Sequence, residues 1–498
     1  ETLRGVSDPD TGVMAFLGVP FAEPPVGALR WTAPRPLADK RGYRDTKEFA
    51  PACMQKPRIL EWYRDYAEIF GAPRDSYAPL VVDEDCLYLN VWTPSLAPEQ
   101  PMPVMVYVHG GSNNSGWSYE IPYHGQYLAK QGVVVVTIAY RLGAFGFLSH
   151  PDLDGDAVAN FGLWDQIAAL RWVKRNISSF GGDPGRVMVF GESAGAEDIL
   201  ALLFAGPADG LIDRAALHST AGFGLRQPSL DEERARGTGL AHALSVPNSI
   251  DALRAIAAEQ LLDVYDEHFG TYYHSPAVDG QLLLESTWDS IRGESATGVP
   301  IIIGTNADEW LEDVDPDADM EMVQHRGNRL KHIDADTALR AVSGETDPRE
   351  ALDRLFTADD MLCPSQFTAN RWNERGGDAW HYYFTRVRDG DAGRQVGAFH
   401  GAEYTYVFGT NYVGMPVSNV DRALTRTMMK YWIQFAASGD PNSDWAPDWP
   451  AFVAPDFNAQ ELGNTVRTIA RPEADMCASF DRFHDAPERS FSNQATSQ

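Results

Sequence analysis

One serine of this chain lies in a setting that favours a nucleophile. The run Gly191-Glu192-Ser193-Ala194-Gly195 follows a short apolar segment, residues 186–190, and precedes an apolar stretch, residues 199–204. A strand, a sharp turn and a helix in this order lift a serine hydroxyl clear of a sheet, and small residues flank it because the turn leaves no room for larger ones. The pattern is common by chance, but this context favours a nucleophilic Ser193 over an ordinary glycine-rich turn.

A second glycine-rich turn could supply the donors that such a serine needs. When a serine attacks a carbonyl carbon, the carbonyl oxygen becomes negative and requires backbone N–H groups close to it. The run His109-Gly110-Gly111-Ser112 follows the apolar segment 103–108 directly. We expect Gly111, Ser112 and Ala194 to form this oxyanion hole; the alternative is a turn without catalytic duty.

The segments around these turns predict alternating strands and helices. Six β-branched or aromatic runs bounded by Gly, Pro, Asp or Ser are predicted as buried strands: 103–109, 132–140, 186–191, 214–219, 299–305 and 379–387. Residues 164–176 have apolar positions at helical spacing before a Gly-Gly-Asp-Pro stop. This alternation predicts an α/β fold in which helices cover both faces of a mostly parallel sheet.

The length of 498 residues permits one large domain. Two stretches rich in helix formers, at about 230–290 and 317–370, interrupt the alternation and are predicted as helical cap insertions. We therefore predict a single catalytic domain over residues 1–491. The polar stretch 492–498 is predicted to be a disordered tail.

Further motifs resemble those of the type-B carboxylesterases, the group that includes the cholinesterases and the bile-salt-type lipases. The matching runs are GVPFAEPPVG at 18–27, EDCLYLNV at 84–91, YRLGAFGFL at 140–148 and NFGLWDQ at 160–166. The resemblance extends nearly from end to end. It implies the α/β-hydrolase fold and a serine hydrolase that cleaves carboxylic esters through an acyl-enzyme intermediate.

The resemblance also selects the partners of the serine among 12 His and 70 Asp and Glu residues. A serine hydroxyl needs an imidazole to remove its proton, and the imidazole needs a carboxylate to orient it. Glu309, after the predicted strand at 299–303, matches the family's acid, with Asp308 as the alternative. His400, after the strand at 379–387, matches the family's histidine. Glu192 and Ser219 are expected to support this triad without taking part in the chemistry; for Ser219 the alternative is a strand-end hydroxyl bonded to the backbone.

Four cysteines form an even set. Cys53, Cys86, Cys363 and Cys477 allow three pairings, or four reduced thiols. The resemblance implies bonds from Cys53 to Cys86 and from Cys363 to Cys477. Disulfides indicate an oxidising compartment, so we expect a secreted or periplasmic protein.

The chain departs from the family pattern close to the predicted site. Ser112 replaces the usual third glycine of the oxyanion loop, and Asn113 and Asn114 replace the usual aromatic pair. We expect the two amides to give the pocket a polar floor. Glu197 and Asp198 stand where the family more often has small residues. We expect them to face a buried partner such as an arginine; the alternative is that they tune the local electric field.

Other patterns near these residues are less specific. Trp62, Trp117 and Tyr119 are candidates for the pocket lining, with loop packing as the alternative. The acidic run 312–321 has alternating carboxylates but lacks the central glycine of a calcium loop and contains Pro316. Solvated acidic surface is therefore preferred to a cation site.

Composition makes some classes of binding partner unfavourable. The formal net charge of -29 would repel a nucleic-acid backbone, and the apolar runs are shorter than the ~18 residues of a membrane-spanning helix. We expect a small-molecule ester as the substrate, no nucleic acid, no membrane span, and a monomer or homodimer. The predicted chemistry requires no metal and no organic cofactor.

Two alternatives to an ester hydrolase remain at this level. One is a binding protein on the same fold, as adhesion relatives of the family are, but such relatives lose the nucleophile. The other is an amidase that uses the same triad. The acyl and alcohol groups of the substrate are not predicted.

Overall fold

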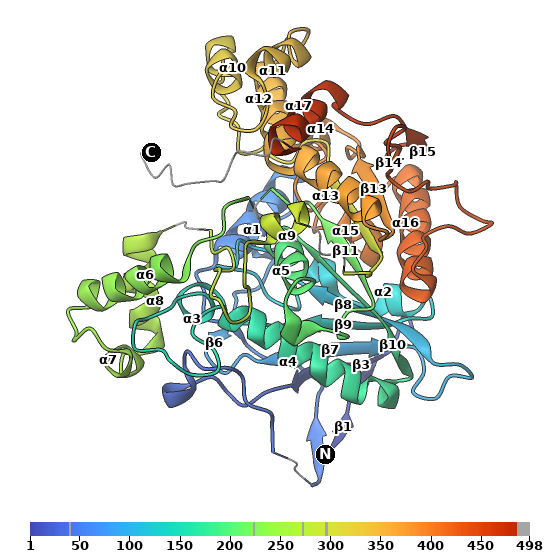
Figure 1. Cartoon of the computed structure of the whole chain (residues 1–498). Coiled ribbons are helices and arrows are strands. Elements are labelled where there is room, and N and C mark those ends of the chain that lie inside the picture. The colour runs from blue at the N-terminus through green and yellow to red at the C-terminus, as the bar shows by residue number, and fades with distance from the viewer. Residues whose placement is uncertain (39–40, 223–224, 271–272, 294–296, 486–498) are drawn as a thin grey trace.

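The computed structural model describes residues 1–38, 41–222, 225–270, 273–293 and 297–485. Its centre is an eleven-stranded sheet with the order β15-β14-β13-β12-β11-β10-β8-β9-β7-β3-β2 (Figure 1). Its strands are β2 (Val6–Ser7), β3 (Met14–Pro20), β7 (Tyr88–Thr93), β8 (Met102–Val108), β9 (Val134–Ile138), β10 (Gly182–Glu192), β11 (Arg214–His218), β12 (Ile301–Asn306), β13 (Ala379–Phe384), β14 (Ala459–Leu462) and β15 (Val466–Ile469). Two small sheets pair β1 (Thr2–Arg4) with β4 (Tyr43–Asp45) and β5 (Ala52–Cys53) with β6 (Val82–Asp83). The predicted tail, 492–498, lies outside the described residues.

The sheet is parallel in its middle and antiparallel at both edges. Neighbouring strands from β14 across to β9 run parallel, whereas β15 and the strands β7, β3 and β2 run antiparallel to their neighbours. The six predicted strands correspond to β8, β9, β10, β11, β12 and β13, and the mostly parallel α/β architecture is confirmed. The edge strands were not predicted from sequence.

Alternate residues of the central strands pack on opposite faces of the sheet. On β8, Val104 and Val106 belong to the core beneath α4 (Phe161–Asn176) and α5 (Ala194–Leu202). Met105 and Tyr107 belong to the core beneath α16 (Asn419–Ser438). Each face is therefore covered by helices, and both faces of β8 are fully buried.

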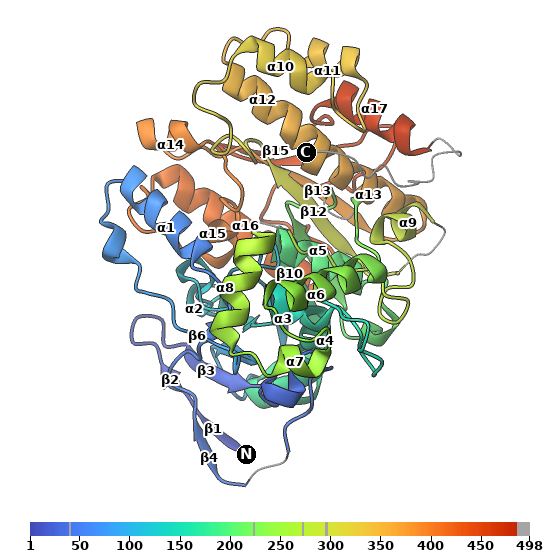
Figure 2. The same cartoon turned by 90° about the vertical axis from the view of Figure 1, so that its left-hand side faces the viewer.

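The remaining helices lie mainly in the two predicted insertions and near the chain ends. They are α1 (Arg58–Ile69), α2 (Gln126–Ala129), α3 (Gly143–Gly146), α6 (Leu230–Ala243), α7 (Ile250–Arg254), α8 (Ala258–Phe269), α9 (Thr287–Arg292), α10 (Met320–Gly327), α11 (Ala335–Ala341), α12 (Pro348–Thr357), α13 (Cys363–Glu374), α14 (Asp391–Val396), α15 (Tyr404–Phe408) and α17 (Ala474–Asp485). The helices α6 to α8 and the helices α10 to α12 form two separate groups, the latter beside α17 (Figures 1 and 2). Serine or aspartate side chains cap six of these helices: α6, α7, α9, α10, α11 and α12.

Two disulfides fasten loops to the body. Cys53 is bonded to Cys86, which closes the loop that carries α1, and Cys363 is bonded to Cys477, which joins α13 to α17. This is the pairing that the family resemblance implied. Each bond is expected to stabilise the fold by about 2–5 kcal/mol.

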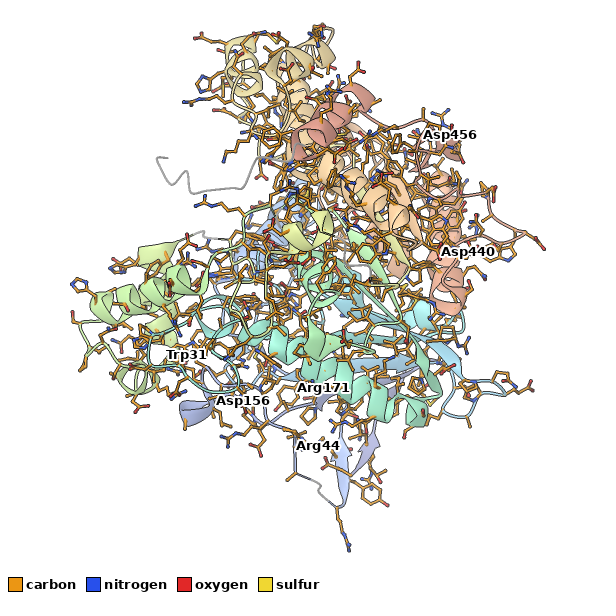
Figure 3. All side chains as sticks on the ribbon, in the orientation of Figure 1. Trp31, Arg44, Asp156, Arg171, Asp440 and Asp456 are labelled. Carbon is orange, nitrogen blue, oxygen red and sulfur yellow. A yellow bond between two sulfur atoms is a disulfide. The ribbon has the colours of Figure 1, made fainter. Side chains whose placement is uncertain are left out.

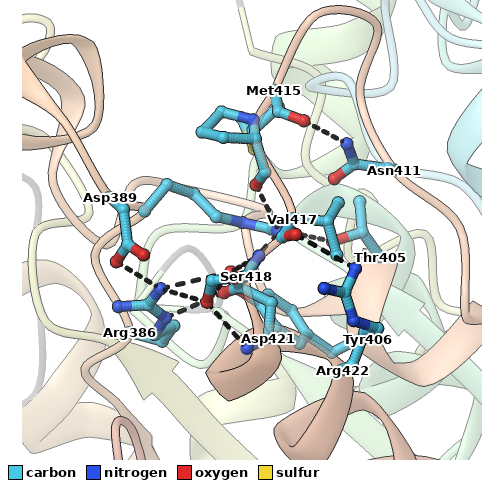
Figure 4. Close-up of polar contacts among 12 residues, drawn as sticks. Arg386, Asp389, Thr405, Tyr406, Asn411, Met415, Val417, Ser418, Asp421 and Arg422 are labelled. Atoms are coloured by element: carbon cyan, nitrogen blue, oxygen red, sulfur yellow. Dashed lines mark hydrogen bonds and ion pairs between the residues drawn. The ribbon is translucent and has the colours of Figure 1, made fainter.

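A buried cluster fixes the start of α16 (Figure 4). The Asp421 carboxylate accepts from the backbone N–H of Ser418 at 2.7 Å, from Arg386 Nε at 2.8 Å and from the Tyr406 hydroxyl at 2.8 Å. Burial alone would raise the pKa of Asp421, but the bonds from Arg386 and Ser418 outweigh it and hold this pKa well below its usual range. The cluster ties α16 to the segment after β13.

Acidic side chains lie on the outside of the molecule. Asp156, Asp440 and Asp456 are exposed, and Figure 3 shows them at its periphery. Among the helices that the structure describes, none combines the length and apolarity needed to cross a bilayer.

Candidate active site

Ser193 lies at the junction of β10 and α5. Between Glu192, which ends β10, and Ala194, which begins α5, it has φ 54° and ψ −127°. This backbone conformation is sparsely populated by residues with side chains and costs of order 1–3 kcal/mol. Its N–H donates to the carbonyl oxygen of His218 at 2.9 Å. The surrounding strand and helix therefore hold Ser193 in a strained turn.

The glycines around Ser193 allow this turn to pack against the end of β8. A Cβ on Gly195 would lie 2.3 Å from the carbonyl oxygen of Val108, and a Cβ on Gly191 would lie 2.7 Å from the same atom. Neither position can accept a side chain without moving β8. The predicted reason for the Gly-x-Ser-x-Gly pattern, lack of space, agrees with this packing.

Loops after three neighbouring parallel strands bring Ser219, Glu309 and His400 together. His400 Nδ1 lies 2.6 Å from Glu309 Oε2. The other oxygen of Glu309 accepts from the Ser219 hydroxyl at 2.6 Å and from the backbone N–H of Asn306 at 2.7 Å. Glu309 is fully buried, so these three donors replace water around its carboxylate. Asp308 instead accepts from the backbone N–H of Ala398 at 2.6 Å.

The second ring nitrogen of His400 faces the neighbour of the serine. His400 Nε2 lies 3.0 Å from Glu192 Oε1. In the described part of the chain, no hydrogen bond joins the Ser193 hydroxyl to His400. Bonds of this kind are often long without substrate, so this geometry does not exclude His400 as the base.

Two carboxylates set the charge of His400. Burial lowers the pKa of the imidazole, but Glu192 and Glu309 outweigh burial and raise this pKa well above its usual value. Burial also raises the pKa of Glu192, although His400 opposes that shift. Glu192 is therefore an electrostatic partner of His400 as well as its neighbour.

The loop from Gly110 to Asn113 passes beside the serine in a left-handed conformation. The φ angles of Gly111, Ser112 and Asn113 are 101°, 60° and 53°. A Cβ on Gly110 would lie 3.1 Å from the Cβ of Ser193. Among the hydrogen bonds of the described residues, none is donated by the backbone N–H groups of Gly111, Ser112 or Ala194. Gly111 and Ser112 are half-buried, and Ala194 is fully buried.

The two asparagines of this loop differ in their surroundings. Asn113 is 0 % exposed, and its amide is hydrogen-bonded to Asp198, to the His274 backbone and to the Tyr140 hydroxyl. It therefore packs into the interior and does not line a pocket, contrary to the expectation from sequence. Asn114 is half-buried.

The acids on α5 have no arginine partner among the described residues, which corrects the expectation from sequence. Glu197 accepts from Ser275 and Tyr273, and Asp198 accepts from Asn113 and Gln166. Both carboxyl groups are fully buried. Neutral donors can satisfy a buried carboxyl because burial itself favours its uncharged form.

Of the predicted pocket aromatics, Trp62 is the one whose ring reaches the neighbourhood of His400. Its ring centre lies 6.0 Å from that of Phe399, and its Nε1 donates to Glu312 at 2.9 Å. Trp117 packs against Tyr63, with ring centres 6.1 Å apart. Tyr119 stacks on Phe49 at 4.7 Å. Trp117 and Tyr119 thus make the loop-packing contacts that were the alternative.

Several residues beside the site were missed by sequence reasoning. The indole ring of Trp310 stacks on His400, with ring centres 5.6 Å apart and planes 15° apart. Behind Ser193, His218 lies 3.0 Å from Glu403 and accepts from Trp432 Nε1 at 3.0 Å. Because Trp310 directly follows Glu309, the sequence could have placed it near the site. The residues around Trp432 do not indicate its contact with His218.

The acidic run 312–321 divides between the site and the surface. Glu312 also accepts from the Tyr66 hydroxyl, and burial raises the pKa of Glu312 to about 7. Asp313, Asp315 and Asp317 are exposed, and Asp319 caps α10. Within the described ranges, no group of three or more His, Cys, Asp or Glu side chains could hold a metal ion.

Comparisons with known proteins agree on one family. The family model described as "Carboxylesterase family" matches residues 2–479. The chain is 34% identical to the para-nitrobenzyl esterase of Bacillus subtilis over 462 residues, which cover 89% of this chain and 90% of that protein. It is also 34% identical to the fumonisin B1 esterase of Sphingopyxis macrogoltabida, with 88% of this chain and 82% of that protein covered.

A solved structure of a PNB esterase superposes on this chain with a TM-score of 0.82 and 31% identity. The match covers 96% of this chain and 97% of the other. Likeness of this extent confirms the fold expected from the sequence, that of the α/β hydrolases.

Proposed function

The chain belongs to the carboxylesterase family, and from that premise we propose that Ser193, His400 and Glu309 cleave esters through a covalent acyl-enzyme. Membership makes the protein a carboxylic-ester hydrolase of the type-B group. The observation that carries the proposed triad is the contact of 2.6 Å between His400 Nδ1 and Glu309 Oε2, next to a strained serine turn. A carboxylate at Nδ1 fixes the tautomer whose Nε2 can accept a proton.

The first half of the reaction acylates the serine. His400 Nε2 takes the proton of the Ser193 hydroxyl while the serine oxygen bonds to the ester carbonyl carbon. The carbonyl oxygen becomes negative, and the N–H groups of Gly111, Ser112 and Ala194 stabilise it. The bond to the alcohol oxygen then breaks, and His400 returns the proton to that oxygen as the alcohol leaves.

The second half repeats these steps with water. His400 removes a proton from a water molecule, whose oxygen bonds to the acyl carbon and releases the Ser193 oxygen. That oxygen recovers the proton from His400, and the carboxylic acid leaves. Glu309 keeps its contact with Nδ1 throughout and stabilises the imidazolium that forms twice in each cycle. Ser219 holds Glu309 in position.

Substitution of the triad tests the proposal directly. With p-nitrobenzyl acetate as a probe, Ser193→Ala and His400→Ala should each lower kcat by at least about 10⁴-fold. Glu309→Gln should lower kcat by about 10⁴-fold because the amide orients the wrong tautomer, and Asp308→Asn should lower it much less. Undiminished turnover by Ser193→Ala would exclude this mechanism. The matched amide, N-(p-nitrobenzyl)acetamide, compares ester with amide cleavage.

We propose further that the protein works outside the reducing cytoplasm, as a secreted or periplasmic enzyme. Both cysteine pairs are within bonding distance, and the described residues contain no free cysteine. Disulfides persist in oxidising compartments. Thiol labelling of protein from each fraction of the native cells tests this: labelled cysteines in active protein would contradict it.

A further inference from the structure

Two departures from the family pattern meet in the interior. Asn113 Nδ2, from the oxyanion loop, donates to Asp198 Oδ1 at 2.9 Å. The second oxygen of Asp198 accepts from Gln166 Nε2 at 2.5 Å. Asn113, Gln166 and Asp198 are each fully buried. The loop after β8 is thus bonded to the helix that follows the nucleophile.

The Asn113 amide has a partner for each of its polar atoms. Besides Asp198, Nδ2 donates to the backbone oxygen of His274 at 2.9 Å, and Oδ1 accepts from the Tyr140 hydroxyl at 3.1 Å. The same hydroxyl donates to the His109 carbonyl oxygen at 2.7 Å. The side chain therefore connects α5, the end of β9 and the segment 273–275 to one point of the loop.

A second path runs from Glu197 to the same loop. Glu197 accepts from the Ser275 hydroxyl at 2.6 Å and from the Tyr273 hydroxyl. Between these two residues, the His274 N–H donates to the carbonyl oxygen of Ser112 at 3.1 Å. Glu197 thus holds a segment whose backbone holds Ser112.

We propose that Asp198 and Glu197 are positioning residues that hold the turn at Gly111, Ser112 and Asn113 with its N–H groups toward the ester carbonyl. This inference rests on the proposed oxyanion hole. Asp198 acts through the Asn113 side chain, and Glu197 acts through residues 273–275.

The backbone of the turn explains why anchors are needed. Ser112 carries a Cβ and still has φ 60°, so other conformations of the loop compete with the observed one. Ala194 and Asp198 are four residues apart on α5, hence on one side of the helix. A single rigid element therefore carries one proposed donor and anchors the loop that carries the other two.

The chemistry of the anchors suits a site where negative charge develops. Burial is the main cause that raises the pKa of Glu197 to about 7 and that of Asp198 well above its usual value. Burial thus favours the uncharged form of both groups, which places no second anion near the oxyanion. The Oε1 atom of Gln166 has no partner among the described residues, so the amide in its flipped orientation could accept the proton of Asp198.

The test compares a p-nitrophenyl ester with its thionoester, in which sulfur replaces the carbonyl oxygen. Asp198→Ala and Asn113→Ala should each lower kcat for the oxoester by about 10- to 100-fold with little change in KM. They should lower kcat for the thionoester much less, because sulfur gains less from the N–H donors. The double variant should lose no more than the worse single variant, because both residues act through one contact.

Further variants separate positioning from general loss of structure. Glu197→Gln, which keeps hydrogen bonds to the same hydroxyls, should lose at least fivefold less activity than Glu197→Ala. Asp421→Asn removes a buried carboxylate from another network and should leave the oxoester to thionoester ratio unchanged. An unchanged ratio in Asp198→Ala and Asn113→Ala, with or without a fall in kcat, would overturn the inference. Failure of the proposed function would give a different result, because Ser193→Ala would then retain turnover.

Discussion

His400 lies between two carboxylates with different tasks. Glu309 contacts Nδ1 and is bonded to Ser219 and Asn306, so it is held rigidly and orients the ring. Glu192 lies by Nε2, the nitrogen that in the proposed mechanism must be free of a proton before Ser193 can react. Because both carboxylates favour the imidazolium, the base becomes available only as the pH rises through the raised pKa of His400.

Glu192→Gln should therefore move the acidic limb of the pH profile. Loss of the Glu192 charge lowers the pKa of His400, so the neutral base exists at lower pH than in the wild type. We expect the acidic limb of kcat/KM to shift down by about one pH unit. A pH profile with a neutral ester measures this. A limb that stays in place would show that Glu192 does not control the imidazole.

The same substitution should also lower catalysis at its optimum. Glu192 stabilises the imidazolium that forms in the transition state, and an amide does so less well. We expect kcat at the alkaline plateau to fall by about tenfold, or ~1.4 kcal/mol. Asp308→Asn removes the charge of the residue next to Glu309. It serves as the matched control and should not move the acidic limb.

At the scale of elements, the site is assembled where parallel strands end. The segments after β8, β10, β12 and β13 carry the oxyanion loop, Ser193, Glu309 and His400, and such ends meet at one edge of a sheet. Helices then hold the loops: α5 reaches Asn113, and the cluster at the start of α16 holds Tyr406 in α15, which follows the His400 loop.

Asp421→Asn should destabilise the protein without removing its activity. It replaces a buried carboxylate that is bonded to Arg386 and leaves the exposed Asp389 as the remaining carboxylate partner of the guanidinium, at a cost of about 3 kcal/mol. Urea unfolding at pH 7 measures the loss. A loss under 0.5 kcal/mol, on the scale of a surface change, would contradict the assignment.

The effect of Asp421 should depend on pH in a defined direction. Its folded pKa is depressed, so its contribution is complete above the unfolded value of about 3.9 and is lost as the pH falls toward the folded pKa. The difference in stability between wild type and Asp421→Asn should be constant from pH 7 to pH 5. It should narrow below about pH 4.

At the scale of the whole molecule, the two disulfides enclose chain segments of different length. The bond between Cys363 and Cys477 closes a loop with a sequence separation of 114, against 33 for Cys53 and Cys86. The longer bond joins α13, on the sheet, to α17 near the end of the described chain. Loss of chain entropy in the unfolded state favours the longer link.

The loss of stability on removing each disulfide should follow the same order. Replacing both cysteines of a pair by alanine should cost up to about 5 kcal/mol for Cys363 and Cys477, and about 4 kcal/mol for Cys53 and Cys86. Thermal unfolding of the two double variants measures the order. The variant without the shorter link should also lose activity, because that loop carries Trp62 beside the site. A reversed order of melting temperatures would show that local packing outweighs chain entropy.

Local sequence was sufficient where a conformation depends on neighbouring residues. The nucleophile turn requires glycines by contact with Val108, and the central strands are apolar on both faces because helices bury both. Both constraints can be recognised from the residue types within one short segment. The edge strands are harder to recognise from sequence. β15 is short and largely exposed, and the pairing of β3 with β7 is non-local.

Only the tertiary structure decided what the unusual polar residues touch. Asn113 was expected in the pocket and lies in the interior against Asp198, and the acids of α5 meet hydroxyls and amides where an arginine was expected. Trp310 was not expected against His400. A sequence specifies which residues can hydrogen-bond or stack, but partners come from segments many residues apart, and the packing of the folded chain selects among them.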